Sequence, residues 1–130
     1  MTRQRTFRQP QIADLLETAH RDLTQAVSAI SPLLASAEGY LSWGSAQCEA
    51  TLARDAVRRA PSLPAESSVP QDDQSTTSPA TGSLAMRLRS VATTTERTLL
   101  RAADIASDVD DTLACLTAAL HCARLRDALR

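Results

Sequence analysis

The sequence predicts an all-α protein: two long amphipathic helices that pack as an elongated antiparallel hairpin or coiled coil, joined by a disordered linker. Apolar residues recur at alternating steps of three and four along 10–60 and again along 84–130, which is the spacing of an amphipathic helix. The only aromatic residues are Phe7, Tyr40 and Trp43. Because large aromatic side chains usually dominate a compact core, we expect close packing of small residues in an elongated molecule.

Residues 1–9 are predicted to form a basic flexible arm. They contain Arg3, Arg5 and Arg8, no acidic residue before Asp14, and no apolar periodicity. A solvated tail is the simplest interpretation of such a segment. An organelle presequence and a nucleic-acid tether are the alternatives.

Residues 10–60 form the first predicted helical arm, for which Pro10 suits the first turn. Its apolar positions follow one helical face: Ile12, Leu16, Ala19, Leu23, Ala26, Ile30, Leu33 and Ala37. Pro32 interrupts this face without changing its register. A proline inside a helix removes a backbone hydrogen bond and clashes with the preceding turn, so we expect a kink at Pro32. Two abutting helices, with Ser31 as the N-cap of the second, are the alternative.

Residues 61–83 are predicted to be a disordered linker. The four prolines Pro61, Pro64, Pro70 and Pro79 stand among Ser, Thr, Gln and Asp. Such a segment has too few large apolar side chains to offset the entropy lost on ordering.

Residues 84–130 form the second predicted arm, which contains no proline or glycine. It begins after Ser83, a plausible N-cap, and its apolar stripe lasts more than four heptads. Two helices alone cannot enclose a core. We therefore expect the third and fourth helices to come from a second copy or from other subunits.

The second arm also carries a cluster of aspartates: Asp104, Asp108, Asp110 and Asp111. On a continuous helix the first, second and fourth of these share one face. The calcium-loop pattern does not fit, because it needs glycine and glutamate where Leu113 and Ala119 stand. We interpret the cluster as a solvated acidic face paired with arginines such as Arg101, or as a docking patch for a basic partner.

No metal, cofactor or catalytic site is predicted. Cys115 and Cys122 lie seven residues apart beside His121, which on a helix separates the sulfurs by about 10 Å, too far to bind one zinc ion. Neither His20 nor His121 lies in a catalytic sequence context, and no glycine-rich loop could hold a phosphate. We expect a non-enzymatic protein without a small-molecule substrate.

The net charge of −1 at pH 7 disfavours bulk electrostatic binding to nucleic acid or to an anionic membrane. No apolar run approaches the roughly 18 residues of a membrane span, and three cysteines are too few for a disulfide scaffold. We expect an intracellular protein, cytoplasmic or nuclear, with organelle import and secretion left open.

The predicted function is that of a structural or scaffolding subunit, which assembles with itself or with other helical subunits into a multi-protein complex. The alternative is a self-sufficient homodimeric four-helix bundle that acts as a secreted or regulatory binding protein through the Trp43 region. The predicted interface consists of the large side chains of both stripes and two aromatic residues: Ile12, Leu16, Leu23, Ile30, Tyr40, Trp43, Leu88, Leu99, Ile105, Val109, Leu113, Leu116 and Leu120.

Overall fold

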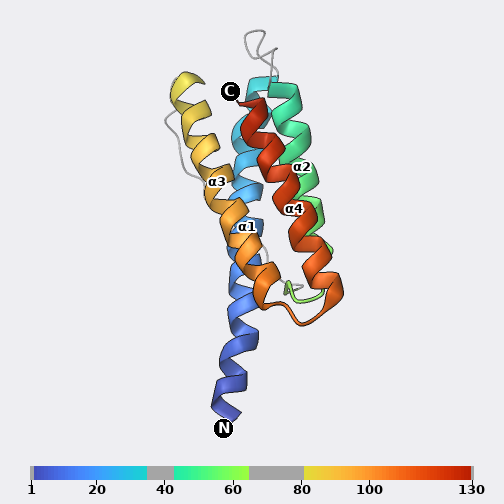
Figure 1. The fold of residues 1–130 in the computed structure, drawn as a ribbon. Helices are drawn as coiled ribbons and strands as arrows, with labels where there is room; N and C mark the ends of the chain where they lie inside the picture. Colours follow the sequence, from blue (N-terminus) through green and yellow to red (C-terminus); the bar gives the residue numbers. More distant parts are fainter. Residues whose placement is uncertain (1, 35–42, 65–80, 130) are drawn as a thin grey trace.

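The fold is known from a computed structural model, which describes residues 2–34, 43–64 and 81–129. These ranges contain four helices and no strand. The helices are α1 (Thr2–Leu34), α2 (Trp43–Arg58), α3 (Thr81–Ile105) and α4 (Val109–Ala128) (Figure 1). The all-α class predicted from the sequence is therefore confirmed.

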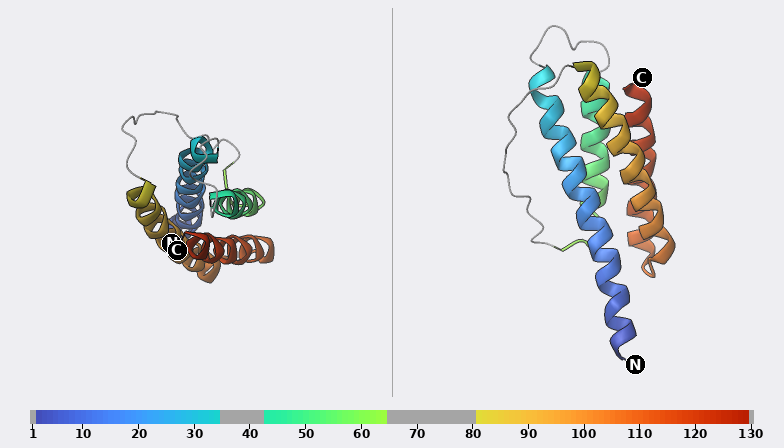
Figure 2. Two further views of the ribbon diagram at one scale, coloured as in Figure 1. Left: turned by 90° about the horizontal axis from the view of Figure 1, so that it is seen from above. Right: turned by 90° about the vertical axis from the view of Figure 1, so that its left-hand side faces the viewer.

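The four helices pack side by side as a bundle. α1 and α4 run in one direction and α2 and α3 in the other (Figure 1). The main contacts join α1 to α2, α2 to α4, α4 to α3 and α3 to α1, so each helix lies between two antiparallel neighbours. The first turns of α1 project beyond the other three helices (Figure 2).

Two apolar clusters fill the bundle from end to end. The larger cluster is built from leucines such as Leu16, Leu23 and Leu99, together with the small residues of α2 and α4. The second cluster surrounds Ile30, Leu88 and Leu125 at the other end. α2 contributes four buried alanines and Val57. Small side chains allow neighbouring helices to approach closely, which explains how the bundle packs without large aromatic residues.

The first arm is two helices, and the prediction of one long helix kinked at Pro32 is wrong. α1 continues through Pro32 to Leu34, and α2 begins at Trp43 in the opposite direction. Pro32 lies in the last turn of α1, where the loss of one backbone hydrogen bond disturbs little of the helix. The fold-back lets the apolar stripe bury itself within the same chain.

The second arm is also two helices, because Asp108 caps a new helix. Asp108 has extended backbone angles, φ −99° and ψ 130°, and its Oδ1 accepts a hydrogen bond from the backbone nitrogen of Asp110 at 2.8 Å. This is the normal arrangement of an N-cap aspartate. Asp110 and Asp111 then occupy the first turn of α4, where the helix dipole favours negative charge. The expectation that Asp104, Asp108 and Asp111 share one helical face is wrong, because the helix breaks between the first two.

These two breaks change the architecture. The chain itself supplies the third and fourth helices that two long arms would have needed from partners. α1 begins at Thr2, inside the segment predicted as a flexible arm, and α3 begins at Thr81. Most of the predicted linker, 65–80, lies outside the described residues. Among the helices that are described, none combines the length and the apolar character needed to cross a membrane.

Candidate functional site

The candidate site is built on α4, which packs against both α2 and α3. Its inner face carries small buried side chains: Ala114, Cys115, Ala118, Ala119 and Cys122. Larger buried residues, Leu125 and Leu129, follow only at its C-terminal end. α4 therefore lies close to its neighbours over most of its length.

The N-terminal end of α4 is fixed by Asp111, whose side chain is buried (2% exposed). Its Oδ1 accepts a hydrogen bond from the backbone nitrogen of Ser62 at 3.0 Å, and its Oδ2 accepts one from the Ser62 hydroxyl at 2.6 Å. A buried carboxylate is tolerated only with such partners. These two bonds hold the segment that follows α2 against the first turn of α4.

Two further polar pairs set the register of α4 against its neighbours. Nδ1 of His121 lies 2.7 Å from Oε1 of Glu49 on α2. Nη1 of Arg126 donates to Oε1 of Glu96 on α3 at 2.6 Å. All four side chains are partly buried, where a hydrogen bond is stronger than on the open surface. α4 is thus held on both sides.

The outer face of α4 is apolar, although no other described part of the chain covers it. The exposed fractions are 69% for Val109, 56% for Leu113, 46% for Leu116 and 50% for Leu120. Their spacing of four, three and four residues places them on one face of the helix. We call these four residues the outer stripe. A helix that is apolar on both its inner and outer faces is normally buried on both.

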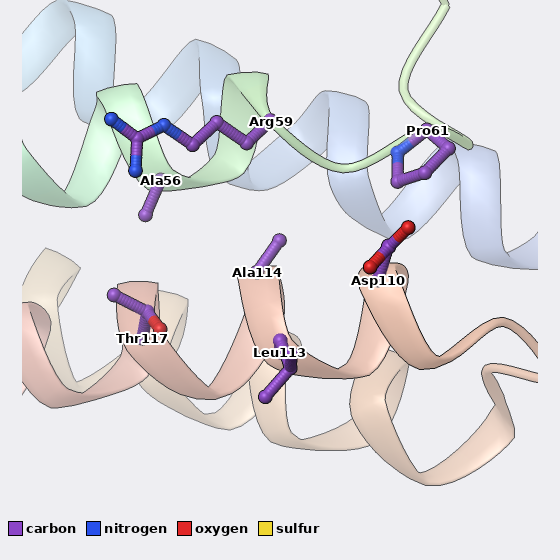
Figure 3. Close-up of a pocket in the computed structure, with 7 residues that line it drawn as sticks. All are labelled: Ala56, Arg59, Pro61, Asp110, Leu113, Ala114 and Thr117. Atoms are coloured by element: carbon purple, nitrogen blue, oxygen red, sulfur yellow. The ribbon is translucent and has the colours of Figure 1, made fainter.

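A shallow groove borders the outer stripe at Leu113, on the side of α2. It has a volume of about 260 Å³. Its lining comes from the end of α2, the segment that follows it and the first half of α4: Ala56, Arg59, Pro61, Asp110, Leu113, Ala114 and Thr117 (Figure 3). Figure 3 shows Ala56 and Ala114 on opposite walls, with Asp110 near Pro61 at one end. The groove extends the apolar surface from α4 towards α2.

The charges around α4 divide between its two ends. Asp108 and Asp110 are exposed at the N-terminal end, beside Asp104 at the end of α3. Arg124 is exposed near the other end. There, a wider surface hollow of about 490 Å³ is lined by residues of α3 and by Arg126: Met86, Arg89, Ser90, Thr93, Thr94, Arg97 and Arg126. The exposed charge is mainly acidic at the first end, where Arg59 is also exposed, and mainly basic at the other end, where Asp127 is also exposed.

The predicted interface residues separate into two groups. One group is buried in the chain's own core: Ile12, Leu16, Leu23, Ile30, Leu88 and Leu99. The other group is exposed and consists of Ile105 and the four residues of the outer stripe. Trp43 is partly buried against the second core cluster, and Tyr40 lies outside the described residues. The structure brings together only the predicted residues of α4 on one exposed surface.

Two of the three cysteines lie in the core of the bundle. All three are free thiols; Cys48 is exposed, and Cys115 and Cys122 are buried. Burial, with the nearby Asp111 carboxylate, raises the pKa of Cys115 to about 11. Burial also raises the pKa of Cys122 to about 12. Within the described ranges, no three His, Cys, Asp or Glu side chains converge on a position that could hold a metal ion.

Two exposed leucines near α4 were not among the predicted interface residues. Leu52 on α2 is 41% exposed and Leu100 on α3 is 45% exposed. Each lies off the main stripe of its helix, and this offset position is the signal that could have identified it. On a helix with one buried face, a leucine beside that face borders the neighbouring helix.

Comparison of the chain with protein-family models, with curated proteins and with solved structures finds no match in any of the three.

Proposed function

We propose that the chain is a non-enzymatic protein-interaction subunit, which binds partner helices through the outer stripe of α4 within a larger assembly. The observation that carries this proposal is the position of the large apolar residues of α4. Val109, Leu113, Leu116 and Leu120 face outward, whereas alanine and cysteine fill most of the inner face. Contiguous apolar surface of this kind is typical of protein-interaction sites.

The dimensions of the outer stripe fit an amphipathic helix as the bound element. The stripe extends over about three turns, or roughly 17 Å at 1.5 Å per residue. Leu113 also borders the groove between α2 and α4. A helix laid along such a surface would place its own anchors at spacings of three and four residues.

The alternative binding site around Trp43 has less support. The indole is partly buried and packs against the second core cluster, as Leu84 and Ala128 also do. An aromatic side chain that is already packed in this way contributes to the fold. The self-sufficient bundle remains compatible with the proposal, because one chain contains all four helices.

The test is site-specific photo-crosslinking in cells from which the chain derives. A photoreactive amino acid at position 116 or 120 should give a discrete adduct of higher mass. The matched control carries the same group at Ser28, which is exposed on α1, the helix diagonally opposite α4. Adducts at Ser28 alone, or none at positions 116 and 120, would contradict the proposal.

A second variant separates binding from chance proximity. Leu113→Asp in the chain that carries the probe at position 120 should abolish the adduct, because docking would bury an unpaired charge. Position 113 is exposed in the free chain, so the fold should be retained, as the far-ultraviolet circular dichroism spectrum can show. A persistent adduct would mean that the outer stripe is not the contact surface.

A further inference from the structure

We infer that the occupant of the outer stripe is a second copy of this chain, packed with its α4 antiparallel to the first about a two-fold axis. This inference rests on the proposed function and names the partner. A two-fold interface brings the same surface of both copies together, so that surface must be complementary to itself. The outer face of α4 meets this condition in its charge pattern and in its apolar stripe.

The charge complementarity comes from a row of residues beside the outer stripe. Asp110, Thr117 and Arg124 follow one another at intervals of seven residues, and therefore lie on the same side of α4, two turns apart, or about 10 Å. Asp110 and Thr117 line the groove on the α2 side (Figure 3). The row is acidic at one end, neutral in the middle and basic at the other.

Antiparallel pairing would match this row with its own reverse. A two-fold axis near Thr117 leaves the row on the same side of both helices and reverses its direction. Asp110 of each copy then faces Arg124 of the other, which gives two opposite-charge contacts. In a parallel pair the two-fold axis would run along the helices and place the two rows on opposite sides of the contact, so Asp110 would not meet Arg124 of the other copy.

The neighbouring helix supports the same orientation. α3 carries Asp104 at the acidic end and Arg89 and Arg97 towards the basic end, all exposed. Since α3 runs antiparallel to α4, its charges reinforce the polarity of the α4 row. An antiparallel second copy would bring the mainly acidic end of each chain to the mainly basic end of the other.

We expect the apolar surface to be widest towards the C-terminal end of the outer stripe. The Glu49–His121 pair sets the register of α2 against α4, and the Glu96–Arg126 pair sets that of α3. Leu52 follows Glu49 by three residues and Leu100 follows Glu96 by four, so these registers place each leucine about one turn along its helix from the paired residue. Both are more than two-fifths exposed. The α4 helix of a second copy would thus lie between two leucine side chains as well as on the stripe.

The first experiment measures the mass of the full chain by sedimentation velocity over a range of concentrations. The wild-type chain should form a reversible dimer, and Leu116→Asp should stay monomeric with an unchanged circular dichroism spectrum. The control is Leu34→Asp on α1, because Leu34 and Leu116 are both 46% exposed; this variant should dimerise like the wild type. A monomeric wild-type chain at all concentrations would overturn the inference.

A charge-exchange experiment tests the orientation. Asp110→Arg and Arg124→Glu should each weaken the homodimer about tenfold at low salt, because two attractive contacts become repulsive. The double variant, and an equimolar mixture of the two single variants, should each recover wild-type affinity. Single variants with wild-type affinity, or no recovery in the double variant, would overturn the antiparallel arrangement.

Sedimentation and photo-crosslinking together distinguish failure of the second-copy inference from failure of the proposed function. If the chain is monomeric but a probe at position 116 forms an adduct with a different protein, the second-copy inference fails and the proposed function stands. If the wild-type chain is monomeric and no adduct forms, both fail. An adduct of twice the mass of the chain, together with the sedimentation dimer, supports both.

Discussion

The inner and outer faces of α4 differ in a way that runs against the usual organisation of a monomeric helix. The inner face is lined mainly by alanine and cysteine, and the outer face by valine and leucine. In a helix that packs on one side only, large apolar residues lie inside and polar ones outside. The comparison indicates that the inner face allows close packing within the bundle and that the outer face holds most of the apolar area still available for burial.

The energetic consequence follows from this distribution. Burying apolar surface contributes about 25 cal/mol per Å², so covering a half-exposed leucine contributes roughly 1 kcal/mol. Leu113, Leu116 and Leu120 are each about half exposed. Substitutions on the outer face should therefore affect association, whereas substitutions on the inner face should affect the stability of the bundle.

The largest expected effect is a difference in unfolding free energy between substitutions at two leucines of α4. Leu125→Ala should lower the free energy of unfolding by about 2 to 5 kcal/mol, because Leu125 is fully buried in the second core cluster and the substitution leaves a cavity. Leu120→Ala should change it by less than about 0.5 kcal/mol, since Leu120 is half exposed. Urea unfolding, at chain concentrations too low for dimerisation, measures the free energy of unfolding of both variants. Similar losses at the two positions would remove the distinction between the faces.

The buried carboxylate of the inner face provides the second test. Asp111→Ala removes the acceptor of both Ser62 hydrogen bonds and should cost about 2 to 3 kcal/mol in thermal or urea unfolding. Asp111→Asn should cost less. Its amide oxygen can accept from the Ser62 backbone nitrogen, and its amide nitrogen can donate to the hydroxyl. Equal losses for the two variants would show that the charge matters more than the hydrogen-bond geometry.

Close packing of the inner face is tested by adding volume. Ala118 is fully buried, so Ala118→Leu should destabilise the bundle by about 1 to 3 kcal/mol through overpacking. Thr117→Leu is the matched control, because Thr117 is the adjacent residue and is exposed; at chain concentrations too low for dimerisation, it should leave the unfolding midpoint nearly unchanged. A neutral Ala118→Leu would mean that α4 does not approach its neighbours closely.

Much of the fold could be predicted from hydrophobic spacing, but the number of helices could not. The stripe through Leu16, Leu23 and Ile30 identified the buried face of α1, and the stripe through Leu88 and Leu99 that of α3. Hydrophobic register alone does not reveal where a helix turns back, because both helices of a hairpin contribute to one core. Between α3 and α4 the sequence does contain a signal for a new helix. Asp108 precedes Val109 and is followed by acidic residues in the next turn, which is an N-cap pattern.

The candidate site was predictable only in part for a related reason. A residue such as Leu116 has the same type and spacing as a core leucine. Whether its face is inner or outer depends on which helices surround α4, and that is a tertiary property. The structure separates Leu116 from Leu99 by burial, whereas the sequence grouped them together. Asp111 is the opposite case, a charged residue that is buried. Its burial depends on Ser62, which lies 49 residues away in the sequence.

The smallest expected effect concerns the buried thiols, which should make the bundle less stable at alkaline pH. Burial raises the pKa of Cys115 to about 11 and that of Cys122 to about 12, from an ordinary value of 9.0. Above pH 9 the unfolded chain loses these thiol protons while the folded chain retains them. The folded state then binds more protons than the unfolded state, so stability is fully present below about pH 9 and falls as the pH rises.

The expected size is about 1 kcal/mol per pH unit for each thiol between pH 9 and 11. The sequence suits this measurement because it contains no lysine and one tyrosine, so few other groups titrate in this range. Urea unfolding at pH 8, 9 and 10 measures how the free energy of unfolding falls as the pH rises. This fall should be smaller for Cys122→Ala than for the wild type. Cys48→Ala, at an exposed thiol, should keep the wild-type slope. If Cys122→Ala also has the pH dependence of the wild type, the Cys122 thiol is not shielded from water, and the inner face of α4 is open to solvent.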